Sequence, residues 1–210
     1  MKVAIIGAGP AGLYTAYLLK KWIGEHIDIT VVEQNPADAT FGFGVVFSDR
    51  ALEFLRKDDP DTHDAIVPHM ERWDDLTINV QEQEFRVDGF GFTSIGRLEL
   101  LKILQARAKS VGVSPEYNRV VESVDEFSGA DLIIATDGVN SLVRNTYEKE
   151  FGTEITFHPN KFLWYGTTKP YDTLTQTFRA NSDGEFNVHH YRYAPDKSTF
   201  LVETNASTWE

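Results

Sequence analysis

The stretch that decides the fold is Lys2–Lys21, KVAIIGAGPAGLYTAYLLKK. The apolar residues after the lysine predict a buried strand over 2–6. Three glycines follow at Gly7, Gly9 and Gly12, and the apolar residues beyond them recur at helical spacing, which predicts a helix over 10–21. A second strand is expected over 27–33, IDITVVE, so the chain begins with a compact strand–helix–strand unit.

The three glycines have the spacing of a dinucleotide-binding turn, GxGxxG, between a strand and a helix. In such a turn Gly7 allows the sharp bend, Gly9 lets the backbone approach a pyrophosphate, and Gly12 lets helix and strand pack closely. Pro10 and Ala11 open the helix, whose free N–H groups and positive dipole end favour phosphate. The spacing therefore predicts a cofactor site that includes all five residues.

Glu33 lies 21 residues after Gly12, at the end of the second predicted strand. An acidic residue at this place holds the adenosine ribose hydroxyls of a bound dinucleotide and disfavours a 2′-phosphate, so FAD or NAD is expected there. Gln34, the next residue, is included among the expected cofactor contacts. The alternative is a glycine-rich turn followed by a solvated glutamate at a strand end.

The composition narrows the class of protein. Apolar residues make up 41% and charged residues 25% of the chain, as in an ordinary globular protein. The net charge of −12, without a cluster of Lys or Arg, argues against a nucleic-acid partner. The chain has no cysteine, and no spacing resembles a metal site. The uncharged run 3–19 is explained by the glycine turn, so we predict no membrane segment and a cytoplasmic location.

A second motif lies at Asp131–Arg144, DLIIATDGVNSLVR. An apolar run ends in Asp137-Gly138, and an Asp-Gly pair is usually a signal for a tight hairpin. The residues after Gly138 do not have the pattern of a second strand, because their apolar members recur at helical spacing. The pattern predicts a buried strand joined directly to a helix.

This segment resembles the Asp-Gly motif of the aromatic-ring flavin monooxygenases, the para-hydroxybenzoate hydroxylase-like group. The resemblance implies a Rossmann-like FAD-binding domain of the glutathione-reductase type, in which Asp137 and Gly138 approach FAD. Gly96-Arg97, at the start of a helix predicted over 97–111, matches a further family feature. By that resemblance Arg97 contacts the phosphate side of FAD; the alternative is an ordinary exposed helix arginine.

Four longer stretches resemble a subgroup that includes salicylyl-CoA 5-hydroxylases, 2-aminobenzoyl-CoA monooxygenases and the tryptophan hydroxylase of violacein biosynthesis. They are FGFGVVFSD, GRLELLKILQARAKSVGV, KFLWYGTTKPYD and STFLVETNASTW. The resemblance implies an oxidoreductase that hydroxylates a small aromatic substrate, with aryl-CoA thioesters among the candidates, using FAD, NAD(P)H and dioxygen. Two alternatives stay open: a non-catalytic dinucleotide-binding module, and a flavoprotein reductase without oxygenation.

We predict an α/β protein with two parts. Residues 1–158 are expected to form the FAD-binding domain, with a strand insertion at about 76–95. Residues 159–210 are expected to begin an antiparallel β-sheet substrate domain, with strands over 161–168, 175–179, 185–193 and 199–204. The segments 41–48 and 58–64 are expected to be a loop and a polar link.

The β region carries the weak catalytic candidates His189 and His190, which alternate to opposite faces of a strand. Either could meet a phenol or an amine; the alternative is that both are satisfied sheet residues. The resemblance also implies a later Gly-Asp segment that contacts FAD, and no Gly-Asp pair occurs in the 210 residues. We therefore expect the N-terminal portion of a longer enzyme, with a dimer or a C-terminal partner chain as candidate assemblies.

Overall fold

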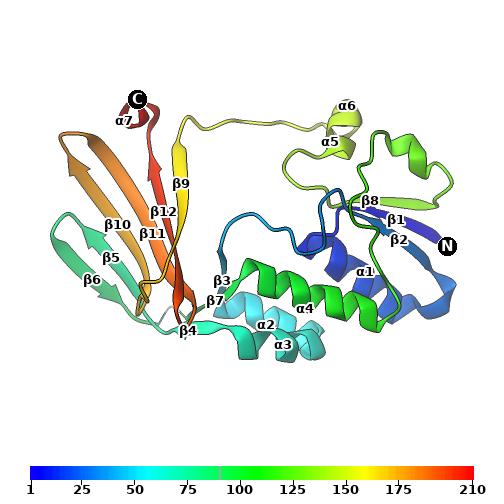
Figure 1. Cartoon of the computed structure of the whole chain (residues 1–210), viewed down its shortest axis with the longest axis horizontal. Coiled ribbons are helices and arrows are strands. Elements are labelled where there is room, and N and C mark those ends of the chain that lie inside the picture. The colour runs from blue at the N-terminus through cyan, green and yellow to red at the C-terminus, as the bar shows by residue number, and fades with distance from the viewer. Residues whose placement is uncertain (90) are drawn as a thin grey trace. The chain divides into compact units, whose positions relative to one another are not determined.

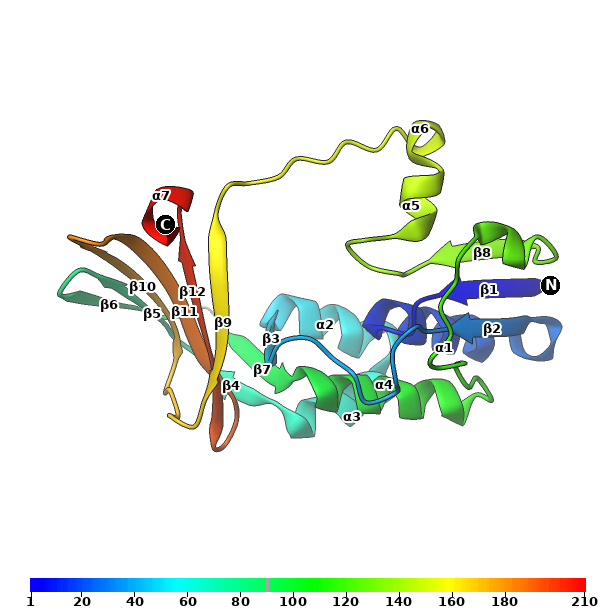
Figure 2. The same cartoon turned by 45° about the horizontal axis from the view of Figure 1, so that its top comes forward.

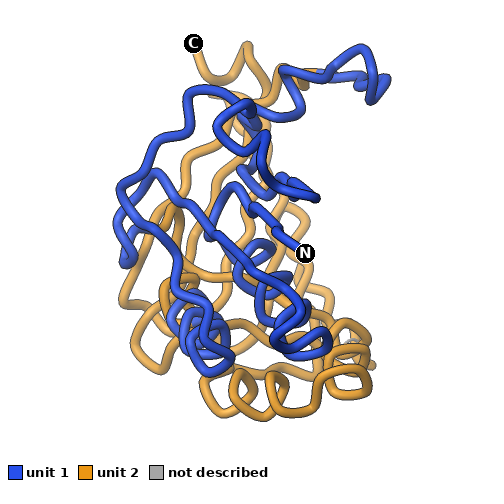
Figure 3. Tube along the Cα trace, turned by 90° about the vertical axis from the view of Figure 1, so that its right-hand side faces the viewer, with its two compact units in different colours: residues 1–39, 100–156 blue, residues 40–99, 157–210 orange. Residues whose placement is uncertain are grey.

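The computed structural model describes residues 1–89 and 91–210, and their contacts divide into two compact units (Figure 3). Unit 1 comprises residues 1–39 and 100–156, and unit 2 comprises residues 40–99 and 157–210. The division falls within helix α4 (Arg97–Ser110). Each unit has at least one β-sheet of its own.

Unit 1 is built on a parallel sheet with the strand order β2-β1-β8 (Figure 1). The strands are β1 (Lys2–Ile6), β2 (Asp28–Val32) and β8 (Leu132–Ala135), and helix α1 (Pro10–Ile23) connects the first two. In register, Ile5 of β1 pairs with Val31 of β2 and with Ile134 of β8. This confirms the predicted strand–helix–strand start and the α/β class.

Both faces of β1 are covered, which explains why its sequence is apolar throughout rather than alternating. Val3 and Ile5 lie on one face, and Ala4 and Ile6 on the other. Ala4 and Ile6 pack in a cluster with residues from the 3-10 helix η3 (Val124–Phe127) and the short helix α5 (Leu142–Thr146). Helix α6 (Glu148–Phe151) follows α5, and the 3-10 helix η1 (Gly24–His26) follows α1.

Unit 2 contains two sheets. The larger has the order β6-β5-β10-β11-β12-β9, and the smaller has the order β3-β7-β4 (Figure 2). The strands of the larger sheet are β5 (Leu76–Val80), β6 (Gln83–Val87), β9 (Lys161–Thr167), β10 (Leu174–Asn181), β11 (Gly184–Ala194) and β12 (Lys197–Thr204). Those of the smaller are β3 (Gly44–Ser48), β4 (Glu71–Trp73) and β7 (Phe92–Gly96). The helices are α2 (Asp49–Asp58), α3 (Pro60–Ile66), η2 (Val67–His69) and α7 (Ala206–Trp209).

Two segments expected to be irregular are regular. The end of the expected loop 41–48 forms β3, which pairs with β7 along its whole length. Most of the expected polar link 58–64 is helical: α2 ends at Asp58 and α3 begins at Pro60, which occupies its first turn, while Asp59 and Thr62 are buried rather than solvated. Both predictions were wrong because tertiary pairing outweighed the glycine content of 41–48 and burial outweighed the polarity of 58–64.

The larger sheet is not purely antiparallel. Strand β5 pairs in parallel with β10, with Thr77 opposite Thr175, so the segment expected as an insertion in the first domain joins the strands after residue 158. Residues 40–99 thus group by contacts with unit 2, whereas the prediction placed them in the first domain. The sequence could not indicate this, because a pairing between strands far apart in the chain leaves no local pattern. The functional division into 1–158 and 159–210 stays a prediction.

Candidate functional site

The three glycines of the fingerprint have three different surroundings. Gly7 has a φ of +102°, and a Cβ atom placed on it would lie 2.4 Å from the carbonyl oxygen of Thr136. A Cβ on Gly12 would lie 2.0 Å from the carbonyl oxygen of Gly7. A Cβ on Gly9 would meet nothing within 4 Å. Two glycines therefore allow close packing inside the protein, and the third borders open space.

The start of α1 has unused hydrogen-bond donors. Gly9 is its N-cap in an extended conformation, with no side chain capping the helix, and Pro10 occupies the first helical position. The N–H groups of a helix's first turn have no partner within the helix. Pro10 and Ala11 are exposed. This helix end can therefore donate to a phosphate without losing an internal bond.

The carboxylate of Glu33 lies beside the glycine turn. Its Oε2 accepts a hydrogen bond from the backbone N–H of Ala8 at 2.9 Å, and its Oε1 accepts from the backbone and the side chain of Asn35 at 2.9 and 2.8 Å. A carboxylate has about four acceptor positions, so one remains for a ligand hydroxyl. Gln34 is exposed next to it. The bonds to Ala8 and Asn35 fix the orientation of the carboxylate, which the sequence did not predict.

The Asp-Gly segment meets the glycine turn. Thr136, the residue before it, donates its hydroxyl to the carbonyl oxygens of Ile6 and Gly7 at 2.9 and 2.8 Å. Asp137 Oδ2 accepts from the backbone N–H of Leu142 at 2.7 Å, at the start of α5. The segment is therefore a strand–turn–helix connection and not a hairpin, as predicted. The carboxylate of Asp137 faces the helix it precedes.

Gly138 borders open space in the same way as Gly9. Its φ is +80°, which favours glycine, and a Cβ there would meet nothing within 4 Å. The ends of β1 and β8 thus bring two glycines with uncrowded outer faces to the same edge of the parallel sheet, where ligands bind in such folds.

Arg97 lies in unit 2, at the first position of α4. Its backbone N–H donates to the carbonyl oxygen of Phe43 at 2.8 Å, and its guanidinium lies 5.8 Å from the ring centroid of Trp164. The side chain is half-buried, so it is not the ordinary exposed helix arginine of the alternative interpretation. Its contact with FAD stays a prediction.

The two candidate histidines have opposite surroundings on β11. The His190 ring lies 4.1 Å from that of Tyr171 and 5.4 Å from that of Phe200, between centroids. Burial, with smaller effects from the charges of Lys169 and His189, lowers the pKa of His190 to about 4. His189 faces the other side, where its Nε2 lies 3.2 Å from Asn187 Nδ2. His190 has the environment of a core residue, and only His189 lies among polar neighbours.

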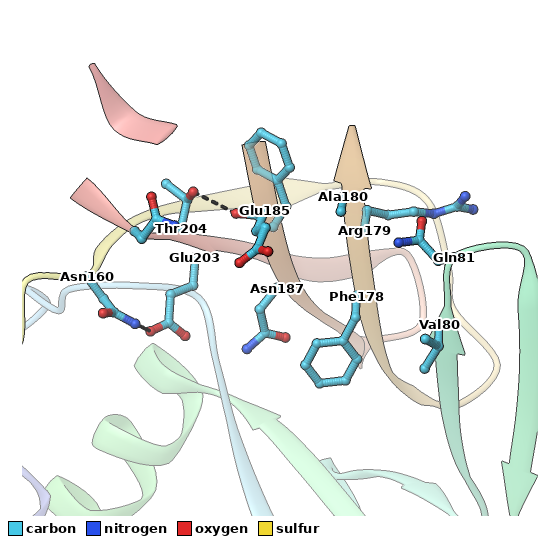
Figure 4. Close-up of a pocket in the computed structure, with 12 residues that line it drawn as sticks. Val80, Gln81, Asn160, Phe178, Arg179, Ala180, Glu185, Asn187, Glu203 and Thr204 are labelled. Carbon is cyan, nitrogen blue, oxygen red and sulfur yellow. Dashed lines mark hydrogen bonds between the residues drawn. The ribbon is translucent and has the colours of Figure 1, made fainter. Parts of the chain in front are cut away.

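On the same side as His189 the larger sheet forms a pocket of about 400 Å³ (Figure 4). Phe178, Asn187 and Glu203 project into it from β10, β11 and β12. Asn160 Nδ2 donates to Glu203 Oε1 at 2.8 Å. Sequence reasoning missed Glu203 and Asn160, because only the strand register places Glu203 opposite Asn187, and only the hydrogen bond to Glu203 brings Asn160 there.

Two further observations concern metals and membranes. In residues 1–89 and 91–210, no group of three or more His, Asp or Glu side chains is placed to hold a metal ion. No helix in this part of the chain has the length and apolarity that spanning a bilayer requires.

Residues 1–203 match the family described as FAD binding domain. The chain belongs to this family. It is 40% identical over 209 residues to salicyloyl-CoA 5-hydroxylase of a Streptomyces species, covering 100% of this chain and 40% of that protein. It is 30% identical over 207 residues to a 3-hydroxy-4-methyl-anthranilyl-(aryl-carrier protein) 5-monooxygenase of Streptosporangium sibiricum, covering 99% of this chain and 58% of that protein.

The fold is also found among solved structures. A tetrameric form of 2-methyl-3-hydroxypyridine-5-carboxylic acid oxygenase matches with a TM-score of 0.80 at 17% sequence identity, covering 98% of this chain and 59% of that chain. The chain therefore spans about 40% to 60% of the length of these relatives. The predicted resemblance to the FAD-dependent aromatic monooxygenases is confirmed, and the family to which the chain belongs is that of an FAD binding domain.

The residues of unit 1 fit FAD. Open space beside Gly9 and Gly138, free donors at the start of α1, and an oriented carboxylate at Glu33 provide a surface for a pyrophosphate and its adenosine ribose. All of these features lie within unit 1.

Proposed function

We propose that this chain supplies the FAD site and part of the substrate sheet of a monooxygenase that hydroxylates an aromatic acyl thioester with NAD(P)H and dioxygen. Bound FAD would supply the oxygen-transfer chemistry, and the residues of the chain bind and orient. The start of α1 would hold the pyrophosphate, Glu33 the ribose, and the Asp137-Gly138 turn would approach the cofactor from β8.

One observation carries this proposal: Gly7 and Gly12 pack tightly inside the protein, whereas Gly9 borders open space at a helix start. If Gly9 were needed only for packing within the protein, a Cβ on it would clash with neighbouring atoms, as on Gly7 and Gly12, and it does not. The substrate class rests on the two relatives named for aryl thioesters, a salicyloyl-CoA and an aryl-carrier-protein-bound anthranilyl group. The proposed substrate is therefore an aromatic acid joined through a thioester to CoA or to a carrier protein.

The test is a titration of the purified chain with FAD, in which the change in the visible absorbance of the flavin measures binding. Gly9→Ala should fold normally and weaken FAD binding about 10-fold or more, because its methyl group would enter the space assigned to the pyrophosphate. Gly129→Ala is the matched control, since a Cβ there also meets nothing within 4 Å. Equal FAD affinity in both variants would show that Gly9 does not face the cofactor.

A second measurement separates oxygenation from reduction alone. NADH and NADPH oxidation are followed with and without salicyloyl-CoA, and the thioester is analysed for an added oxygen atom. A hydroxylated product supports the monooxygenase. Oxidation of NAD(P)H without any hydroxylated product would favour a flavoprotein reductase.

A further inference from the structure

The pocket of unit 2 lies on one face of the larger sheet, here named the pocket face. Strand register brings five residues into one row across it: Val80, Phe178, Asn187, Glu203 and Phe162. The adjacent row, two residues along each strand, contains Ile78, Gln176, His189, Leu201 and Trp164. Each row is apolar or aromatic at both ends and polar in the middle.

Hydrogen bonds connect three of the four residues in the polar centre of the pocket face, namely Gln176, Asn187 and His189. Gln176 Nε2 donates to Asn187 Oδ1 at 3.3 Å, and Asn187 Nδ2 lies 3.2 Å from His189 Nε2. Glu203 sits directly opposite Asn187 in the register of β11 and β12. The centre therefore combines two amides, an imidazole and a carboxylate within neighbouring positions.

Glu203 is the one carboxylate side chain of this centre. Asn160 donates to one of its oxygens, and in the described part of the chain no Lys or Arg forms an ion pair with it. A carboxylate has only acceptor positions, so its second oxygen is open to a donor from water or from a ligand. Because Glu203 is half-buried, a hydrogen bond to its carboxylate is electrostatically stronger than the same bond in bulk water.

Aromatic surface flanks this carboxylate. Phe178 is 40% exposed and lines the pocket with Asn187 and Glu203, and Val80 continues the apolar side at 43% exposure (Figure 4). An aromatic ring resting on Phe178 would place a ring substituent near Glu203. The aromatic surface and the carboxylate together suit a flat apolar ligand that carries a hydrogen-bond donor. A ligand that placed its own carboxylate beside Glu203 would be repelled.

We propose that Glu203, oriented by Asn160 and opposite Asn187 in register, accepts a hydrogen bond from a hydroxyl or amino group on the aromatic ring of the substrate. The contact selects rings with such a donor and increases the electron density that the substituent gives to the ring. This assignment rests on the proposed function, whose relatives are named for a hydroxylated and an amino-substituted aryl thioester. Glu203 is then a specificity-determining residue.

The experiment compares the binding of salicyloyl-CoA and benzoyl-CoA, which differ only in the ring hydroxyl, by titration calorimetry. The unmodified chain should bind salicyloyl-CoA about 10-fold or more tightly, as expected for a hydrogen bond to a charged acceptor. In Glu203→Gln the ratio should fall to about 3-fold or less. Glu84→Gln, on the exposed strand β6 and the opposite face, should keep the full ratio.

The ratio cancels changes in folding and in contacts with the CoA moiety, because both ligands share them. Asn187→Leu is a second variant, and it should lower the ratio in the same direction. The inference is overturned if the unmodified chain binds the two thioesters equally or binds neither, or if Glu203→Gln keeps the full ratio. FAD titration of the same samples measures the proposed FAD site in unit 1. A failure of FAD binding is therefore distinguished from a failure of the Glu203 site in unit 2.

Discussion

At the residue scale, the neighbouring histidines of β11 show how one step along a strand changes chemistry. Side chains alternate across a strand, so His190 packs against Tyr171 and Phe200 while His189 lies on the pocket face. Burial disfavours the charged form of His190. The candidate role of His190 as a base is therefore poorly supported, and His189 is the better candidate of the pair.

The lowered pKa of His190 predicts a pH dependence of stability. The unfolded chain takes up a proton near the ordinary value of 6.5, whereas the folded chain does so only near pH 4. The stabilisation from neutral His190 is therefore complete above pH 6.5 and is lost as the pH falls towards 4. Urea unfolding of the wild type and of His190→Phe should give curves that converge or cross on acidification, with the variant less sensitive.

His26→Gln is the control for this measurement, because His26 is exposed. Its stability should change with pH as the wild type does. A His190→Phe variant with the full acid sensitivity of the wild type would contradict the assigned environment.

At the element scale, α1 can approach β1 only because Gly12 lacks a side chain. Its absent Cβ would overlap the carbonyl oxygen of Gly7 and the hydroxyl of Thr136. Gly12→Ala should therefore lower the free energy of unfolding by about 1–3 kcal/mol, the usual cost of overpacking. Gly9→Ala, one turn earlier, faces open space at a φ that alanine can adopt. The loss of a favourable N-cap residue and the gain from a stiffer unfolded chain oppose each other, so the free energy of unfolding should change by less than about 1 kcal/mol.

Thermal and urea unfolding of the two variants measure this difference. Equal stability of Gly12→Ala and the wild type would mean that α1 is not held against the glycine turn as described. Greater destabilisation by Gly9→Ala than by Gly12→Ala would reverse the assigned roles.

At the scale of the whole molecule, β5 and β6 share a sheet with strands about a hundred residues later in the chain. Val188→Ala removes two methyl groups from the buried middle of β11, at a cost of about 2 kcal/mol. Amide hydrogen exchange should then quicken in β5 and β6 as well as in β10 and β12. Exchange in β1, β2 and β8, which form the separate sheet of unit 1, should change little.

A result in which β5 and β6 keep their exchange rates while β10 and β12 speed up would contradict the parallel pairing of β5 with β10. Phe85→Leu on exposed β6 is a control, because its side chain is half exposed and its loss should affect exchange only locally.

The sequence by itself determined the parts of the site whose chemistry is local. The spacing of Gly7, Gly9 and Gly12 and the strand before them predicted the turn, because bond geometry and helix packing allow few residues at those positions. The helical spacing after Asp137-Gly138 likewise predicted a strand–turn–helix connection. Residues of this kind carry their physical reason within about ten neighbours along the chain.

Only the tertiary structure decided which distant residues meet. The bonds of Glu33 to Ala8 and of Thr136 to Gly7, the parallel pairing of β5 with β10, and the row that places Glu203 beside Asn187 depend on strand order and register. These are set by burial summed over whole strands, and no single segment contains that sum. For this reason the FAD turn was visible in the sequence, whereas the polar centre of the pocket face was not.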